Sequence, residues 1–184
     1  MFESMAGKLL VASPALDDPN FFKSVLLICS HDADSTLGVI LNRPLGTNVD
    51  QLVPEWADGV SSPPVVFQGG PVETQAALGL GRARERGDAS WVLPIPGGMG
   101  LVDLSAGPEA VDGDLDGLRI FAGHSGWGGR QLEQELVEEA WFVLDLWPDD
   151  VFCTEPLSLW SDVLRRQGGE LALYASFPDD PTLN

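Results

Sequence analysis

The sequence predicts a single domain of mixed α and β structure. Short apolar runs bounded by glycine, proline and polar residues are typical of strands, and a few other segments have the apolar spacing of amphipathic helices. The connections have hairpin-like lengths and do not follow a regular strand–helix–strand alternation. With 184 residues, 44% of them hydrophobic, the chain can bury a core without disulfides or a structural metal. We therefore expect one domain over residues 1–184, with a loosely attached tail over 178–184.

The first quarter of the chain predicts strands. Residues 7–16 are expected to form a strand that runs into a Ser-Pro turn. Residues 22–30 and 37–42 are apolar and separated by a polar stretch, which favours a hairpin. Pro44 should end this hairpin, because proline cannot donate a hydrogen bond to a strand ladder. Residues 47–56 are weakly helical.

The middle of the chain is also expected to be mostly extended. Residues 65–68 form a strand candidate, 69–72 a glycine-proline turn, and 76–80 an alternating apolar strand. The segment 91–101 contains too many prolines for a central strand, so we expect an edge strand or a loop there.

The most informative segment begins with the apolar run 118–122, expected to be a short buried strand. Glycines follow at 123, 126, 128 and 129, and they predict a turn because glycine adopts backbone angles closed to other residues. A helix should come next, since apolar residues then recur at helical spacing. The expected apolar face is Leu132, Leu136, Val137, Ala140 and Trp141.

Two elements are expected near the C-terminus. Residues 157–166 predict a second amphipathic helix, with Trp160, Val163 and Leu164 on its apolar face. Gly168 should end it, because glycine is the usual residue just after a helix. Residues 171–174 are expected to form the last strand.

The charge of the chain bears on its partners. Ten lysines and arginines face 28 acidic residues, giving a net charge of −18. Duplex binding depends on basic side chains that neutralise phosphates, so direct contact with nucleic acid is not expected. No apolar run approaches the roughly 20 residues that span a bilayer, and the N-terminus lacks a signal-peptide pattern. We therefore expect a cytoplasmic protein without membrane contact.

The two cysteines predict neither a disulfide nor a metal site. Cys29 and Cys153 lie far apart and in no ligand-like spacing, so both should be reduced thiols. Cys29 sits in an apolar run and should be a small buried hydrophobe. Aspartates 32 and 34 beside His31 resemble the start of a calcium loop, but the later ligand positions do not match, and a polar hairpin turn explains them equally.

The glycine-rich turn invites comparison with the nucleophile elbow of hydrolases, in which a serine is exposed on a strand–turn–helix. Trp127 occupies the position where that turn needs glycine, and no histidine follows His124 in the chain. A pairing of His31 with Ser125 is the arrangement still open to such an enzyme, and we favour a structural turn over it. A hydrolase that uses Ser125 or Cys153 is kept as the alternative function.

Anion binding at the start of the expected helix is also disfavoured. No P-loop or dinucleotide fingerprint is present, and Glu133 in the first turn would repel a phosphate. Its carboxylate would itself interact favourably with the helix dipole, which favours a structural capping role.

The chain resembles the YqgE/AlgH family of small bacterial proteins. The matching segments occur in order along nearly the whole sequence: 7–21, 24–31, 38–45, 68–72 and 123–136. In this family the signature usually contains tyrosine followed by alanine or serine, so His124 and Ser125 are local variations. A residue that can be replaced within the pattern is a poor candidate for obligatory chemistry.

The resemblance implies an α+β fold of coiled, bifurcated mixed β-sheets with flanking helices, and no established activity or cofactor. It also implies a regulatory association, since one member is linked to transcriptional control of alginate production. We expect a non-enzymatic binding or regulatory protein with no metal and no cofactor. An unidentified protein or small molecule should be its partner, and direct DNA binding by a transcriptional regulator is a second alternative.

If the matched loops converge, they define a candidate binding site of nine residues. These are Asn42, Arg43, Pro44, Gly69, Gly70, Pro71, Trp127, Gln131 and Glu133. Two roles are open for Arg43: it could bind a ligand, or it could form a salt bridge to Glu133 that holds two loops together.

Overall fold

The computed structural model describes residues 3–84, 91–111 and 114–179, in which ten strands form one sheet. The strands are β1 (Leu9–Ala12), β2 (Val25–His31), β3 (Ser35–Ile40), β4 (Pro44–Asn48), β5 (Val65–Gln68), β6 (Val72–Ala83), β7 (Leu93–Ile95), β8 (Met99–Val102), β9 (Leu115–Gly128) and β10 (Trp141–Leu144). The helices are α1 (Val49–Leu52), α2 (Gln131–Val137), α3 (Leu159–Gln167) and α4 (Gly169–Tyr174), with 3-10 turns at Pro54–Gly59, Leu104–Ala106, Pro108–Ala110 and Pro156–Ser158.

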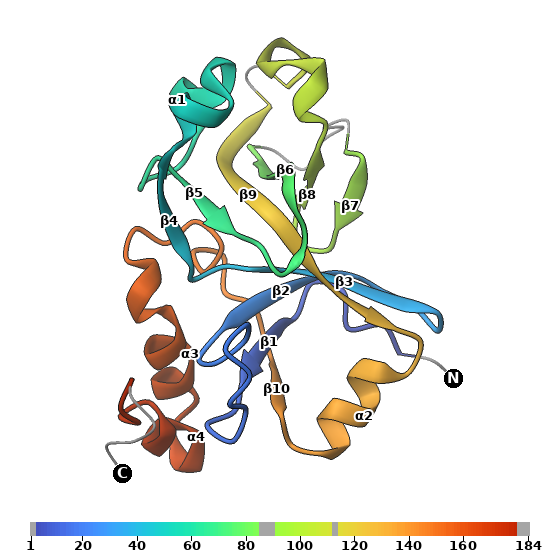
Figure 1. The fold of residues 1–184 in the computed structure, drawn as a ribbon, viewed down its shortest axis with the longest axis vertical. Helices are drawn as coiled ribbons and strands as arrows, with labels where there is room; N and C mark the ends of the chain where they lie inside the picture. The colour runs from blue at the N-terminus through green and yellow to red at the C-terminus, as the bar shows by residue number, and fades with distance from the viewer. Residues whose placement is uncertain (1–2, 85–90, 112–113, 180–184) are drawn as a thin grey trace.

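The sheet is curled and branched around β9 (Figure 1). Its main path runs β10-β1-β2-β3-β9-β6-β8-β7, with the neighbours antiparallel. The strand β5 joins β9 in parallel and pairs with β4 on its other side. The α+β class is therefore confirmed, and the branch arises because β9 pairs with β3, β5 and β6 at different points of its length.

Several expected elements are present. The hairpin of residues 22–30 and 37–42 is confirmed as β2 and β3, with Leu26 opposite Ile40. The strand over 65–68 is β5. The proline-rich segment 91–101 contains β7, which lies at one end of the sheet path as expected of an edge strand, but its last residues begin β8, which lies between β6 and β7.

The prediction of a turn at the glycine-rich part of the signature is wrong. The strand β9 continues through it to Gly128, and its last residues pair with β3, Gly126 opposite Leu37 and Gly128 opposite Ser35. Of the four signature glycines, only Gly123 has a left-handed φ, of +72°. Glycine permits both a turn and an extended chain, and here the ladder to β3 selects the extended form, so the chain reverses only after Gly128.

The two C-terminal expectations also need correction. Helix α2 ends at Val137, so Ala140 and Trp141 lie outside it and Trp141 pairs with Ala12 in the sheet. The residues 171–174, expected to be a strand, belong to α4. A short apolar run is compatible with a strand or a helix. Here the run is helical, and the helix that it forms, α4, packs against the preceding α3.

Helix α3 is confirmed and lies against the main core, with Trp160, Val163 and Leu164 buried as expected. The Trp160 indole donates to the Ala12 carbonyl oxygen at 2.9 Å, which fixes the helix to β1. Cys29 is buried in the same core, and burial raises the pKa of its thiol to about 12. It is therefore a small hydrophobe, as predicted.

No helix in the described ranges is both long enough and apolar enough to cross a membrane. The predicted tail begins at residue 178, and its residues 180–184 lie outside the described part of the chain.

Candidate functional site

Arg43 does not form the predicted salt bridge to Glu133. Its guanidinium donates to two backbone carbonyls, those of Asn20 and Phe22, the second at 3.1 Å. Burial lowers the pKa of Arg43, and nearby Asp18 partly opposes that shift. Arg43 thus holds the loop between β1 and β2, because carbonyl oxygens of that loop were closer acceptors than the carboxylate on α2.

Asn42 and Pro44, the neighbours of Arg43, also make contacts within the fold. The Asn42 side chain accepts from the Val25 amide at 2.9 Å and donates to the Lys23 carbonyl at 2.9 Å. Pro44 begins β4 opposite Phe67. The hairpin therefore ends near Pro44 as predicted, but the chain continues into another strand.

Gly69 and Gly70 pass directly beside β9, and this close approach explains why neither can carry a side chain. A Cβ on Gly69 would clash with the carbonyl of Gly123, and one on Gly70 with the carbonyl of His124. The Ser125 hydroxyl, which is fully buried, donates to the Gly69 carbonyl at 3.1 Å. Two of the predicted segments therefore do meet here, and they meet through close contact between their backbones.

Pro71 and His124 lie at the outer side of the same contact. Pro71 is exposed just before β6 begins. The His124 Nδ1 lies 3.9 Å from the Glu73 carboxylate, whose residue has a left-handed φ of +49°. This histidine therefore contacts the start of β6.

Trp127 belongs to an aromatic cluster under α2, which we call the indole cluster: Phe21, Trp127, Trp141 and Glu135. The Glu135 Oε2 accepts from both indole nitrogens, at 2.9 Å from Trp127 and 2.8 Å from Trp141. The two indoles meet edge to face, and Phe21 stacks on Trp127. One carboxylate thus satisfies two buried N–H donors, and Trp127 serves packing.

Gln131 stabilises the start of α2. Its side chain accepts from the Gly128 amide at 3.2 Å and donates to Glu135 at 3.1 Å. The residue before it, Arg130, has a left-handed φ of +64° and makes no side-chain cap. Gln131 therefore links α2 to the end of β9, and Glu133 lies in the first turn of the helix as predicted.

Glu133 contacts His31, a pairing that no spacing in the sequence indicated. The His31 Nδ1 accepts from the Met5 amide at 3.0 Å, so its Nε2 carries the proton and donates to Glu133 at 3.3 Å. The two residues lie 102 positions apart. The only available signal was that both fall in segments shared with the resembled family.

The aspartates after His31 form a polar hairpin turn. The Asp32 carboxylate accepts from the amides of Asp34 and Ser35, at 2.9 and 3.0 Å. Across the part of the chain that the structure describes, no three histidine, cysteine, aspartate or glutamate side chains are grouped to hold a metal ion.

The second candidate nucleophile, Cys153, is half-buried next to Arg119. Burial raises the pKa of its thiol, and the Arg119 guanidinium opposes that shift without cancelling it. Arg119 itself is buried and donates to backbone carbonyls, among them that of Cys153 at 3.2 Å. The thiolate that a nucleophilic cysteine needs is therefore disfavoured at neutral pH.

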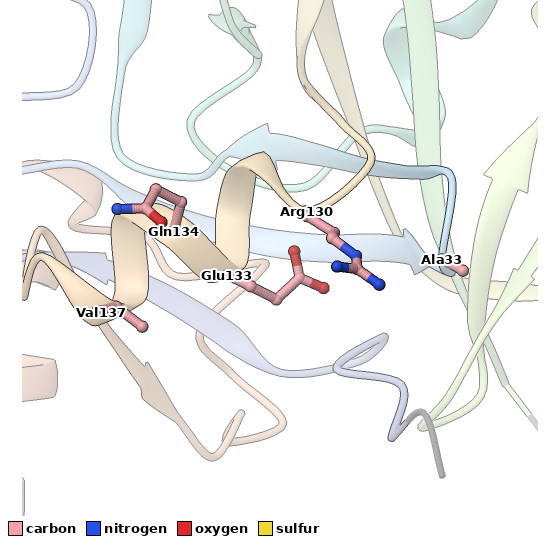
Figure 2. Close-up of a pocket in the computed structure, with 5 residues that line it drawn as sticks. All are labelled: Ala33, Arg130, Glu133, Gln134 and Val137. Carbon is pink, nitrogen blue, oxygen red and sulfur yellow. The ribbon is translucent and has the colours of Figure 1, made fainter.

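A groove of about 550 Å³ lies along the outer side of α2, and we call it the α2 groove. Its lining residues are Ala33, Arg130, Glu133, Gln134 and Val137. Figure 2 shows the Arg130 and Glu133 side chains extending into the space between α2 and the turn that holds Ala33. Of the nine predicted residues only Glu133 lines this groove; Val137 was expected on the buried face and is instead 79% exposed.

Together, the curled sheet, the indole cluster and the α2 groove define a small α+β protein. Its signature segment connects α2 to β9, the strand at which the sheet branches. The chain belongs to the AlgH-like family, whose model matches residues 9–172. A UPF0301 protein of Streptomyces coelicolor is 50% identical over 186 residues, covering 98% of this chain and 96% of that protein.

Two solved structures have the same fold. A protein from Corynebacterium diphtheriae superposes with a TM-score of 0.87 at 35% identity, covering 94% of this chain and 92% of the other. The AlgH protein from Pseudomonas aeruginosa gives 0.70 at 23% identity, over 98% of this chain and all of the other. The second likeness concerns the fold alone.

Proposed function

We propose that this chain is a cytoplasmic, non-enzymatic binding protein with a regulatory role, and that the α2 groove is its contact surface for a partner. The observation that carries the proposal is the division of α2 into two sides. Leu132 and Glu135 hold the inner side to the sheet, while Val137 is exposed beside the charged Arg130 and Glu133. Ligand sites are concave surfaces that combine apolar contact with a few polar groups, and the α2 groove offers Val137 together with the charges of Arg130 and Glu133.

The two candidate nucleophiles support a role without catalysis. The Ser125 hydroxyl is buried and its proton is engaged with the Gly69 carbonyl. The Cys153 thiol has a raised pKa. Neither residue is in the state that nucleophilic catalysis requires, an exposed hydroxyl beside a base or a thiolate.

The charge of −18 supports a partner other than nucleic acid. The proposed partner is a protein or a small molecule, and any influence on transcription would pass through that partner. A gel-shift assay at physiological salt should detect no specific complex with duplex DNA.

The test is affinity capture from a native lysate with three baits: the wild type, Val137→Asp and Leu157→Asp. The two substituted residues are matched, because Val137 is 79% and Leu157 81% exposed and neither change disturbs a packed core. We expect one partner to be retained by the wild type and by Leu157→Asp, and lost with Val137→Asp.

Equal retention by all three baits would contradict the α2 groove as the contact surface. An esterase or phosphatase activity that disappears in Ser125→Ala or Cys153→Ser would overturn the non-enzymatic assignment itself. Circular dichroism on each variant establishes that it is folded.

A further inference from the structure

A second groove, of about 690 Å³, lies between β10 and α4. Figure 1 places α4 and α2 on either side of β10 at the same end of the molecule. We call this the β10–α4 groove. It shares no lining residue with the α2 groove.

Aromatic rings form one wall of the β10–α4 groove. Phe142 and Tyr174 stack with their ring centres 6.0 Å apart and their planes inclined by 12°. Phe177 meets Tyr174 edge to face at 5.8 Å and is itself 38% exposed. The faces of such rings carry negative charge density and attract ammonium and guanidinium groups.

Carboxylates form the rim. Glu138, Glu139 and Glu170 all line the groove and are exposed, and no basic side chain within the described ranges forms an ion pair with any of them. The Tyr174 hydroxyl lies 3.3 Å from the Glu170 carboxylate, and the charge of Glu170 raises the pKa of Tyr174, with a smaller contribution from Glu139. Two carboxylates, one from α4 and one from the connection between α2 and β10, therefore act on one point of the aromatic wall.

A polar group also lacks a partner at this groove. Ser13 lines the β10–α4 groove, is only 4% exposed, and its Oγ makes no hydrogen bond within the described part of the chain. A buried hydroxyl without a partner is uncommon in a folded protein. Ser13 therefore places a hydroxyl that is unpaired within the described residues next to the groove that it lines.

We propose that the β10–α4 groove binds arginine or lysine side chains from a basic segment of a protein partner. The aromatic wall would receive the cation, the three carboxylates would neutralise it, and the Ser13 hydroxyl would accept one of its N–H donors. A guanidinium satisfies all of these at once, because it is planar, charged and rich in donors. This proposal goes beyond the α2 groove and does not depend on it.

Charge complementarity favours this occupant over two others. A second copy of the chain would bring another net charge of −18 toward the acidic rim. The last five residues of the chain, Asp180 to Asn184, contain no lysine or arginine. A basic partner segment is the occupant whose charge is opposite to that of the groove.

The test uses the fact that Tyr174 is the single tyrosine of the sequence. Full-length protein labelled with 3-fluorotyrosine gives one ¹⁹F resonance, located in the groove. The probe is a decapeptide of alternating glycine and arginine, titrated at physiological ionic strength. A matched glycine–glutamate decapeptide and spermine at equal cation concentration are the comparison ligands.

Two double variants with the same net charge separate groove binding from general attraction to an acidic protein. Glu139→Gln with Glu170→Gln removes two rim carboxylates, and Glu55→Gln with Glu109→Gln removes two exposed carboxylates elsewhere. We expect the arginine peptide to shift the Tyr174 resonance and the groove variant to bind it about tenfold more weakly, with the control double variant nearly unchanged.

Three results would overturn the proposal. The first is an arginine peptide that leaves the Tyr174 resonance unmoved. The second is an equal loss of affinity in both double variants, which would mean that only the net charge attracts the peptide. The third is spermine that binds as tightly as the peptide, which would assign the groove to a small polyamine. Because Val137 lies outside this groove, retention of binding by Val137→Asp is expected whether or not the α2 groove proposal holds.

Discussion

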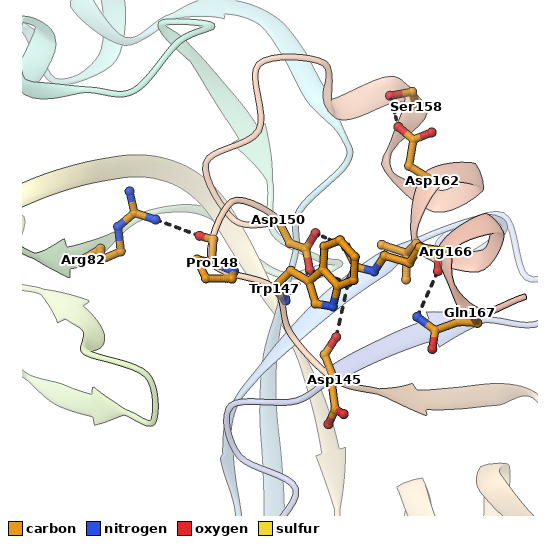
Figure 3. A network of polar contacts seen from close by, with 10 residues as sticks. Arg82, Asp145, Trp147, Pro148, Asp150, Ser158, Asp162, Arg166 and Gln167 are labelled. Carbon is orange, nitrogen blue, oxygen red and sulfur yellow. Dashed lines mark hydrogen bonds and ion pairs between the residues drawn. The ribbon is translucent and has the colours of Figure 1, made fainter.

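Replacing Asp150 by alanine should destabilise this protein more than any change at its surface ion pairs. Figure 3 shows why: Asp150, in the loop that follows β10, faces Arg166 of α3. Its two carboxylate oxygens accept from the two terminal nitrogens of Arg166 at 2.6 and 2.7 Å, and one of them also accepts from the Trp147 amide at 2.7 Å. The guanidinium lies over the Trp147 ring at 4.2 Å.

The magnitude follows from burial. The side chains of Asp150 and Arg166 are only 6% and 14% exposed, so removing the carboxylate leaves a largely buried cation without its counter-charge. Such a loss costs about 3 to 5 kcal/mol. Asp150→Asn keeps an acceptor for the Trp147 amide and should cost less, about 2 kcal/mol. Both changes weaken the attachment of α3 to the sheet.

Urea unfolding followed by circular dichroism measures these free energies. The control is Asp145→Ala, which removes an ion pair with Lys8 whose side chains are 81% and 48% exposed. An exposed pair contributes about 1 kcal/mol or less. If Asp150→Ala lost no more stability than Asp145→Ala, the reasoning from burial would be refuted.

Three further predictions concern the core. Glu135→Ala leaves the indole donors of Trp127 and Trp141 unpaired and should cost about 2 to 3 kcal/mol in urea unfolding, whereas a loss below about 0.5 kcal/mol would show that the carboxylate is dispensable. Gly70→Ala places a Cβ against a β9 carbonyl at a φ of +154°, so we expect a loss above about 3 kcal/mol or no soluble folded protein, and a native melting temperature would contradict this. Between pH 9 and about 12 the folded protein keeps the Cys29 proton that the unfolded chain releases, so the free energy of unfolding should fall by about 1.4 kcal/mol per pH unit over this range. Unfolding measured at several pH values should show that Cys29→Ala lacks this contribution to the pH dependence.

The elements that the sequence predicted well are those whose apolar pattern decides their structure locally. The hairpin of β2 and β3 has an apolar run on each side of a polar turn. Helix α3 buries Trp160, Val163 and Leu164 at helical spacing, and it ends at Gly168 as expected. In both cases distant contacts agree with the local preference.

The incorrect elements are those in which distant contacts decide. The glycines from 123 to 129 permit a turn, but β3 supplies a ladder partner that lies far away in the sequence. The residues 171–174 fit a strand or a helix, and their surroundings make them helical. Val137 continues the apolar spacing of α2, yet the helix ends there and its side chain faces water.

The candidate site was predicted only in outline. Matched segments suggested that the loops around Gly69 and the signature converge, and Gly69 does lie against β9. The sequence did not predict the partners of the charged residues. Arg43 donates to backbone carbonyls, and Glu133 contacts His31. An ion pair depends on distances of a few ångströms that no sequence pattern specifies.

The branching of the sheet at β9 has a consequence for how the protein unfolds. One continuous strand supplies ladder partners to β6 and β5 in its first part and to β3 in its last, so neither half of the sheet can open without exposing the edge of the other. The two halves should therefore lose structure in one cooperative transition. The hydrogen-bonded amides along β9 should then show one common opening free energy in hydrogen exchange, equal to that of global unfolding.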